Sequence, residues 1–80
     1  MTPHTLHDEF PHDTAILHEL KLTNGHYQTL ARRYEEINGE IHRIEAGTAP
    51  ATPAHSEDLK KQRLHLLDEI STMIQRAKVG

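Results

Sequence analysis

Eighty residues without a cysteine allow one small domain and exclude disulfides, thiolate chemistry and cysteine-bound zinc. A net charge of −3, from 9 basic and 12 acidic residues, argues against a dedicated nucleic-acid binder, because phosphate neutralisation needs a surplus of Lys and Arg. No stretch approaches the roughly 20 apolar residues of a membrane-spanning helix, and the start of the chain lacks the apolar run of a signal peptide. We therefore expect a cytoplasmic protein that does not enter a membrane.

The first ten residues are polar and unpatterned, and we expect them to form a flexible, histidine-rich arm over residues 1–10. If the chain held a metal ion, His4, His7 and His12 would be its best ligands, because acidic side chains lie next to them. The His-x-x-x-His and His-Glu-x-x-His spacings of helical zinc sites are missing from the sequence. Neither a metal site nor a cofactor is predicted.

A seven-residue apolar repeat dominates the next segment and predicts one long helix over residues 11–46. Pro11 suits a first helical position, and Asp13 suits a cap or an acid in the first turn. The repeat forms one apolar seam that can contact a second helix along its whole length. The seam residues are Ile16, Leu20, Tyr27, Leu30, Tyr34, Ile37, Ile41 and Ile44.

Two Asn-Gly pairs complicate this helix, at residues 24–25 and 38–39. The spacing places both pairs on the outer face, and each glycine costs about 1 kcal/mol relative to alanine. Because the part of the helix before residue 24 has no facing helix, we expect any break near residues 24–25.

Gly47 predicts the end of the first helix, and the prolines that follow predict an Ala/Pro-rich connector over residues 47–56. Ser56 is the expected N-cap of a second helix over residues 57–78. Its apolar residues cover a wider arc than one partner helix would bury. They are Leu59, Leu64, Leu66, Leu67, Ile70, Met73, Ile74 and Ala77.

These elements predict an all-α fold, a two-helix antiparallel hairpin with coiled-coil-like packing that assembles into a helical bundle. At about 1.5 Å per residue the first helix is the longer one, so its first residues would overhang the second helix. Ile16 and Leu20 lie in that overhang and need a cover. Self-association would supply it.

A family resemblance is carried by short segments spread between residue 6 and residue 77. They are Asp8-Glu-Phe-Pro11, Leu20-Lys21, His26-Tyr27, Leu30, Tyr34, Ile41-His-Arg-Ile-Glu45, Leu59-Lys-Lys-Gln-Arg-Leu64 and Leu67-Asp-Glu-Ile70. This pattern resembles the YdcH-like family of short bacterial proteins, a domain of unknown function. The resemblance implies a small helical hairpin in the bacterial cytoplasm, with no established activity, cofactor or catalytic residue.

No catalytic residue is predicted, because two helices leave little interior for a concave and partly dry site. The leading hypothesis is a non-enzymatic, self-associating module for protein–protein interaction or structure. Its hairpin and oligomer interface would consist of the apolar seam and the apolar residues of the second helix from Leu59 to Ile74. A different protein could dock on the same apolar face, because both uses need the same kind of surface.

Two alternatives remain open. The first is an RNA- or ribosome-associated accessory protein with Lys60, Lys61 and Arg63 as nucleic-acid contacts, although Glu57 and Asp58 are spaced to pair with the lysines. The second is a pH- or metal-responsive switch. The 8 histidines would support it, because they would add about six positive charges between about pH 7.5 and 5.5.

Overall fold

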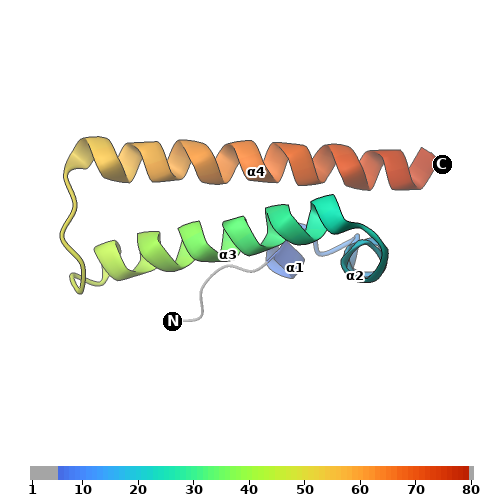
Figure 1. Ribbon diagram of the computed structural model, residues 1–80, viewed down its shortest axis with the longest axis horizontal. Helices are drawn as coiled ribbons and strands as arrows, with labels where there is room; N and C mark the ends of the chain where they lie inside the picture. The colour runs from blue at the N-terminus through green and yellow to red at the C-terminus, as the bar shows by residue number, and fades with distance from the viewer. Residues whose placement is uncertain (1–5, 80) are drawn as a thin grey trace.

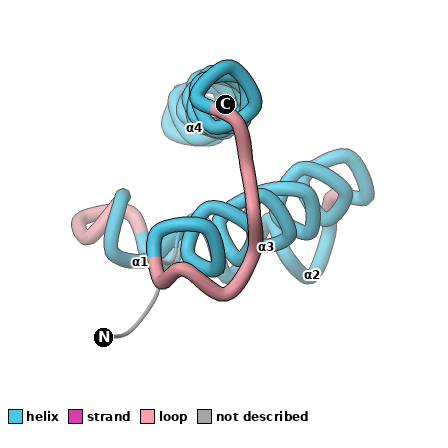
Figure 2. The backbone as a smooth tube through the Cα atoms, turned by 90° about the vertical axis from the view of Figure 1, so that its left-hand side faces the viewer, coloured by secondary structure: helices cyan, strands magenta, loops and turns pink. Residues whose placement is uncertain are grey.

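The structure is a computed structural model that describes residues 6–79. This part of the chain is all-α, as predicted, and its helices are α1 (Leu6–Glu9), α2 (Thr14–Thr23), α3 (Gly25–Glu45) and α4 (Pro53–Val79). α3 and α4 lie side by side and run antiparallel (Figure 1). α2 crosses one end of this pair, and α1 lies on the opposite side of α3 from α2 in the end view (Figure 2). The prediction of two helices is therefore wrong for the described residues, which form four.

Asn24 separates α2 from α3 and caps both helices. Its backbone N–H donates to the carbonyl of Leu20 at the end of α2, at 2.9 Å. Its side-chain oxygen accepts the backbone N–H of Tyr27 in the first turn of α3, also at 2.9 Å. The backbone of Asn24 is extended, with φ −124° and ψ 108°, so the chain changes direction there. The predicted first helix is thus two helices that meet at Asn24, which confirms the position expected for any break.

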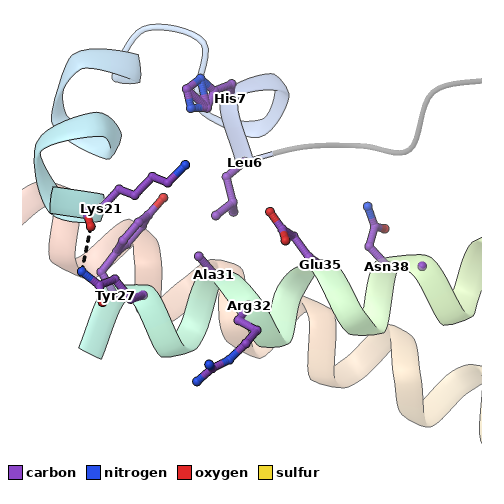
Figure 3. A pocket seen from close by; sticks show the side chains of 10 residues that line it. Leu6, His7, Lys21, Tyr27, Ala31, Arg32, Glu35 and Asn38 are labelled. Carbon is purple, nitrogen blue, oxygen red and sulfur yellow. Dashed lines mark hydrogen bonds between the residues drawn. The ribbon is translucent and has the colours of Figure 1, made fainter. Parts of the chain in front are cut away.

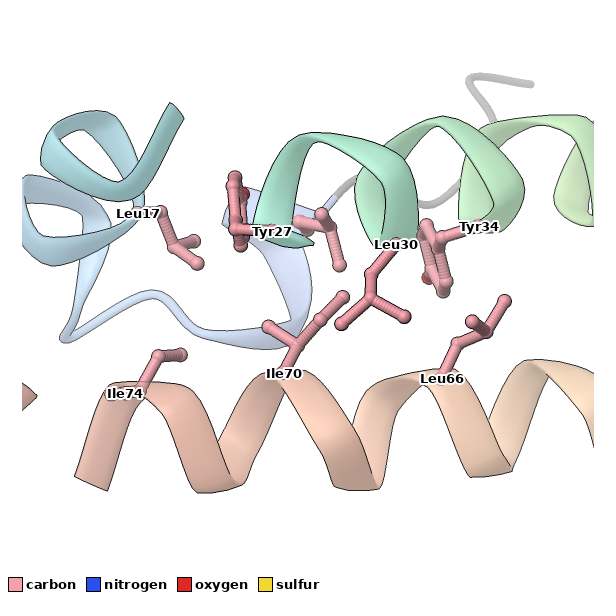
Figure 4. Close-up of a cluster of buried hydrophobic side chains, with 8 residues drawn as sticks. Leu17, Tyr27, Leu30, Tyr34, Leu66, Ile70 and Ile74 are labelled. Carbon is pink, nitrogen blue, oxygen red and sulfur yellow. The ribbon is translucent and has the colours of Figure 1, made fainter. Parts of the chain in front are cut away.

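α2 folds back over the C-terminal end of α4. Leu17 of α2 and Ile74 of α4 are each 1% exposed and point toward one another (Figure 4). The Lys78 ammonium lies 2.9 Å from the Asp13 carboxylate, next to the start of α2. The prediction that the start of the first helix overhangs the second helix is therefore wrong. α3 has 21 residues and α4 has 27, and α2 covers the end of α4 that α3 does not reach.

Residues 6–9 are not part of a flexible arm, because they form the one-turn helix α1. Leu6 is 8% exposed and belongs to the apolar core, and Phe10 packs against the same core while half-buried. α1 ends before Pro11 because the residue preceding a proline is sterically driven out of the helical region. Residues 1–5 of the predicted arm lie outside the described residues.

α3 ends in a glycine-dependent cap. Gly47 adopts a left-handed φ of +78°, its N–H donates to the carbonyl of Ile44, and the next N–H, that of Thr48, donates to the carbonyl of Arg43. This pair of bonds is the Schellman arrangement, which satisfies carbonyls that would otherwise lack partners at a helix end.

α4 begins at Pro53, earlier than the predicted residue 57. Proline is well suited to a first helical position, because its missing N–H would have no partner there. The hydroxyl of Thr52 accepts the backbone N–H of His55 at 3.1 Å and so caps the helix. Thr52 therefore takes the capping role predicted for Ser56, and the connector between α3 and α4 is shorter than expected.

The core is a stripe of apolar side chains between α2, α3 and α4, closed on one side by α1 (Figure 4). Its buried members are Leu6, Leu17, Tyr27, Leu30, Tyr34, Leu66, Ile70 and Ile74. Leu17 is absent from the predicted seam, whereas the seam residues Ile16 and Leu20 are only half-buried. The change of direction at Asn24 accounts for this, because α2 meets α4 at a different angle from α3.

Candidate interaction surfaces

An open groove of about 570 Å³ follows one flank of the α3–α4 pair. Ile37 and Leu66 contribute its apolar part, whereas Arg33, Glu36 and Lys61 are exposed charged residues that line it. Its other lining residues are Gln62 and His65. The groove therefore combines an apolar strip with charges of both signs.

A second hollow, which we call the α1 cavity, has a volume of about 530 Å³ and lies among α1, α2 and α3 (Figure 3). Leu6 points from α1 toward α3, above Ala31. The Gln28 side chain donates to the carbonyl of Lys21 at 2.7 Å and joins α3 to the end of α2 at the cavity edge. Arg32 and Glu35 are further lining residues, both exposed.

Asn38 is the one polar residue among the buried described residues, with 6% of its surface exposed. Its side-chain oxygen accepts a hydrogen bond from the Arg63 guanidinium at 2.9 Å, which ties α3 to α4. The prediction that the Asn38-Gly39 pair lies on the outer face is therefore wrong for Asn38. The signal was available in the sequence, because Asn38 follows Tyr34 by one helical turn and so shares its face.

The hydroxyl of Tyr34 is buried and has no hydrogen-bond partner among the described residues. Burial raises the pKa of Tyr34, and the negative charges of Glu9 and Asp8 raise it further, whereas Arg63 lowers it. Burial, followed by the charge of Glu35, also raises the pKa of Tyr27. The carboxylates of α1 and the guanidinium of α4 thus shift the pKa of the same buried hydroxyl, that of Tyr34, in opposite directions.

The predicted nucleic-acid contacts do not form one patch. Lys60 and Lys61 are exposed, but Arg63 is half-buried and directed toward Asn38. Lys61 instead shares the open groove with Arg33 of the other helix. The Gln62 side chain donates to Asp58 at 2.7 Å.

The histidines among residues 6–79 are exposed, except for the half-buried His42. His55 lies 3.1 Å from Glu40 and His65 lies 3.3 Å from Glu69, and both contacts are exposed to solvent. Within residues 6–79, no three His, Asp or Glu side chains gather as a metal ion would require. The metal candidates His7 and His12 are both exposed, and His4 lies outside the described residues.

The apolar residues that the sequence assigned to a hairpin or oligomer interface are mostly covered within the chain. Those that are buried are Tyr27, Leu30, Tyr34, Ile41, Leu59, Leu66, Ile70 and Ile74. Those that are half-buried are Ile16, Leu20, Ile37, Ile44, Leu67 and Met73. Leu64 differs from both groups, because 61% of its surface is exposed on α4. None of the helices in the described residues has the length and apolar character to span a bilayer.

Fold and surface define a small all-α protein built on an antiparallel helical pair. The family model described as a protein of unknown function (DUF465) matches residues 28–74, more than half of the chain, so the chain belongs to this family. The YdcH-like proteins are members of it, which confirms the resemblance found in the sequence. The match begins within α3 and ends within α4, so α1 and α2 lie outside it. No curated protein and no solved structure matches the chain.

Proposed function

We propose that this protein is a non-enzymatic helical module that acts through protein–protein contacts and associates with itself. The open groove is the observation that supports this proposal. The half-buried Ile37 and the edge of the buried Leu66 form its floor, and it places the exposed Arg33 and Glu36 on one helix. A groove that carries both signs of charge can face a copy of itself across a two-fold axis, with each arginine opposite a glutamate. Action in the bacterial cytoplasm is part of the same proposal.

Leu64 supports the same proposal from another flank of α4. Its side chain is 61% exposed, and the half-buried Leu67 follows it by three residues and lies on the same side of the helix. An apolar side chain of this size next to a half-buried leucine is a small contact area, so we assign it a supporting role beside the groove.

The test is the native mass of the purified protein over a range of concentrations, by light scattering after gel filtration. We expect an oligomer for the natural sequence and a lower mass for Arg33→Glu, which puts a glutamate opposite Glu36 of the other copy. Arg76→Glu is the matched control, because it makes the same substitution at an exposed position outside the groove. A monomer at every concentration would reject self-association.

RNA binding is the second candidate, and Arg33 and Lys61 are the residues that favour it, because both line one groove from different helices. Phosphate contacts from these two cations would weaken as salt is added, because the logarithm of the binding constant falls linearly with the logarithm of the salt concentration. Retention of RNA by the natural protein but not by a variant with Arg33→Ala and Lys61→Ala would support this candidate. Unchanged retention in that variant would dismiss it.

A further inference from the structure

An Asn-Gly pair can modify itself without an enzyme, and the chain holds two such pairs, at residues 24–25 and 38–39. The backbone nitrogen of the glycine can attack the side-chain carbonyl carbon of the asparagine, because no side chain on the glycine blocks its approach. The two pairs are chemically alike but occupy different places in the fold. The fold therefore decides which of them reacts.

Asn24-Gly25 lies at the junction of α2 and α3. Gly25 is the first residue of α3, so its N–H has no partner within that helix. Gly25 is exposed, and a Cβ added to it would meet no atom within 4 Å, so water has access to it. The glycine of this pair is thus free of the contacts that would hold it in place.

The closed junction does not place the two reacting atoms together. The extended ψ of 108° at Asn24 turns the Gly25 nitrogen away from the asparagine side chain, whereas ring closure needs both on the same side. The junction must therefore open before the atoms can meet. Opening breaks two bonds, from the Asn24 N–H to Leu20 and from the Tyr27 N–H to the Asn24 side chain. Both lie at helix ends, where local opening costs least.

Asn38-Gly39 is held more firmly. Asn38 is 6% exposed, and its side-chain oxygen accepts a hydrogen bond from Arg63 of α4 at 2.9 Å. Both residues lie inside α3, where each backbone N–H donates to the carbonyl four residues earlier. Ring closure at this pair requires the central turns of α3 to unwind and to separate from α4.

We propose that Asn24 is a site of spontaneous deamidation, controlled by local opening of the α2–α3 junction, and that the fold protects Asn38. The Gly25 nitrogen gives up its proton to water or hydroxide and bonds to Cγ of Asn24. The bond from Cγ to the side-chain nitrogen breaks, and this nitrogen takes a proton from water and leaves as ammonia. One water then opens the succinimide ring at either carbonyl carbon, which yields aspartate or isoaspartate.

The two products act differently on the junction. Aspartate at position 24 keeps an oxygen for the N–H of Tyr27 and adds negative charge at the start of α3, and both favour the helix. Isoaspartate carries the main chain through its side-chain carbon, so it lengthens the backbone between α2 and α3 and removes the original cap. The isoaspartate product therefore weakens the junction that holds α2 on α4.

The experiment incubates the full chain at mildly alkaline pH, in buffer and in urea, and follows both pairs by mass spectrometry after trypsin digestion. Trypsin places the pairs on separate peptides, residues 22–32 and 34–43. In buffer we expect Asn24 to react at least about tenfold faster than Asn38, because a helix junction opens more readily than a packed helix. In urea the two rates should lie within about threefold of each other, because the fold no longer distinguishes the pairs.

Two alanine variants complete the test. Gly25→Ala should slow the reaction at Asn24 at least about fivefold, because a side chain now hinders the attacking nitrogen. Gly39→Ala raises helix propensity inside α3 and should leave the rate at Asn24 unchanged, because the junction opens without the rest of the helix.

Three results would overturn the proposal. The first is equal rates at Asn24 and Asn38 in buffer, and the second is an Asn24 that reacts in urea but not in buffer. The third is a slower reaction at Asn24 in Gly39→Ala, which would show that the pair reacts through unfolding of the whole chain.

Discussion

A hydrogen bond joins the buried Asn38 of α3 to the half-buried Arg63 of α4, and its donor is charged. A hydrogen bond to a charged group contributes about 1.5–3 kcal/mol, and a buried partner left alone adds a penalty. Polar groups inside an apolar seam also limit the ways in which two helices can align.

We expect Arg63→Ala to lower the free energy of unfolding by about 1–3 kcal/mol, because Asn38 loses its charged partner. Gln75→Ala, an exposed change on the same helix outside the groove, should stay within about 0.5 kcal/mol. Urea unfolding of the single variants and of the double variant with Asn38→Ala measures the coupling between the two residues. Additive effects would contradict the hydrogen bond.

The buried hydroxyl of Tyr34 gives a prediction of the opposite sign. Tyr34→Phe removes a buried polar atom that has no partner, so it should leave stability unchanged or raise it by up to about 1 kcal/mol. Thermal unfolding of Tyr34→Phe is compared with that of Tyr34→Leu, which also removes the ring. The comparison separates the contribution of the hydroxyl to stability from that of ring packing. If Tyr34→Phe lowered the stability as much as Tyr34→Leu does, the hydroxyl would make a stabilising contact.

Stability at alkaline pH follows from the raised pKa of Tyr27 and Tyr34. In the unfolded chain each phenol loses its proton near the ordinary value of 10.0, whereas the folded chain holds its proton to higher pH. The contribution is therefore fully present below pH 10.0 and is lost above it, so the free energy of unfolding should fall there. Phenolate absorbance should rise together with the loss of helical circular dichroism. A phenolate signal that appears below pH 10.0 while the helices are intact would contradict this.

At the scale of elements, the sequence predicts helices well and their connections less well. The seven-residue repeat identifies the face of α3 that becomes buried, because periodicity depends only on residue order. The fold of α2 against α4 could not be derived in the same way, because it depends on the backbone angles of one residue, Asn24. α1 escaped prediction because a single Leu6 gives no periodicity.

Gly39 and Gly47 should respond in opposite directions to replacement by alanine. Gly39 lies inside α3, and an added Cβ would meet only the flexible end of Arg43 at 3.4 Å, so Gly39→Ala should stabilise by about 0.5–1 kcal/mol. Gly47 has a φ of +78°, so Gly47→Ala should destabilise by about 1–2 kcal/mol. Chemical denaturation measures both, and effects of the same sign would contradict the assigned cap.

The side-chain oxygen of Asn24 should stabilise the fold, because it caps α3. Asn24→Ala removes the acceptor for the N–H of Tyr27 and should cost about 0.5–2 kcal/mol, whereas Asn24→Ser keeps an acceptor and should cost less. Urea unfolding compares the two variants. Equal stability of Asn24→Ala and the natural protein would indicate that the helices do not depend on this cap.

At the scale of the whole molecule, the chain covers its own apolar surface more completely than its sequence suggests. The sequence predicts a hairpin with surplus apolar faces, and the structure covers much of that surplus with α1 and α2. The composition of the seam could be predicted, but the partner of each apolar residue could not, since a neighbouring helix and a second chain satisfy the same pattern. The exposed side chains of Leu22, Leu64 and Val79 and the open groove are the apolar surface left for other molecules.

The packing of α2 against α4 changes the effect predicted for a substitution of Ile74. The sequence alone assigns Ile74 to the hairpin and oligomer interface, whereas its burial against Leu17 predicts that Ile74→Ala lowers the stability of the single chain by about 2–5 kcal/mol. Leu64→Ala removes an exposed side chain and should change unfolding little. Denaturation of both variants at several protein concentrations separates a loss of chain stability from a loss of assembly. If Ile74→Ala weakened only the assembly, the packing of α2 against α4 would be contradicted.

This account depends on the fold in which α2 turns at Asn24 and crosses the end of the α3–α4 pair. The most direct measurement is the set of methyl nuclear Overhauser effects between Leu17 and Ile74 in the natural protein. The structure predicts strong cross-peaks between these two side chains, because both are buried in one cluster. Their absence, together with continuous helical contacts through Asn24, would show one long first helix and contradict this account.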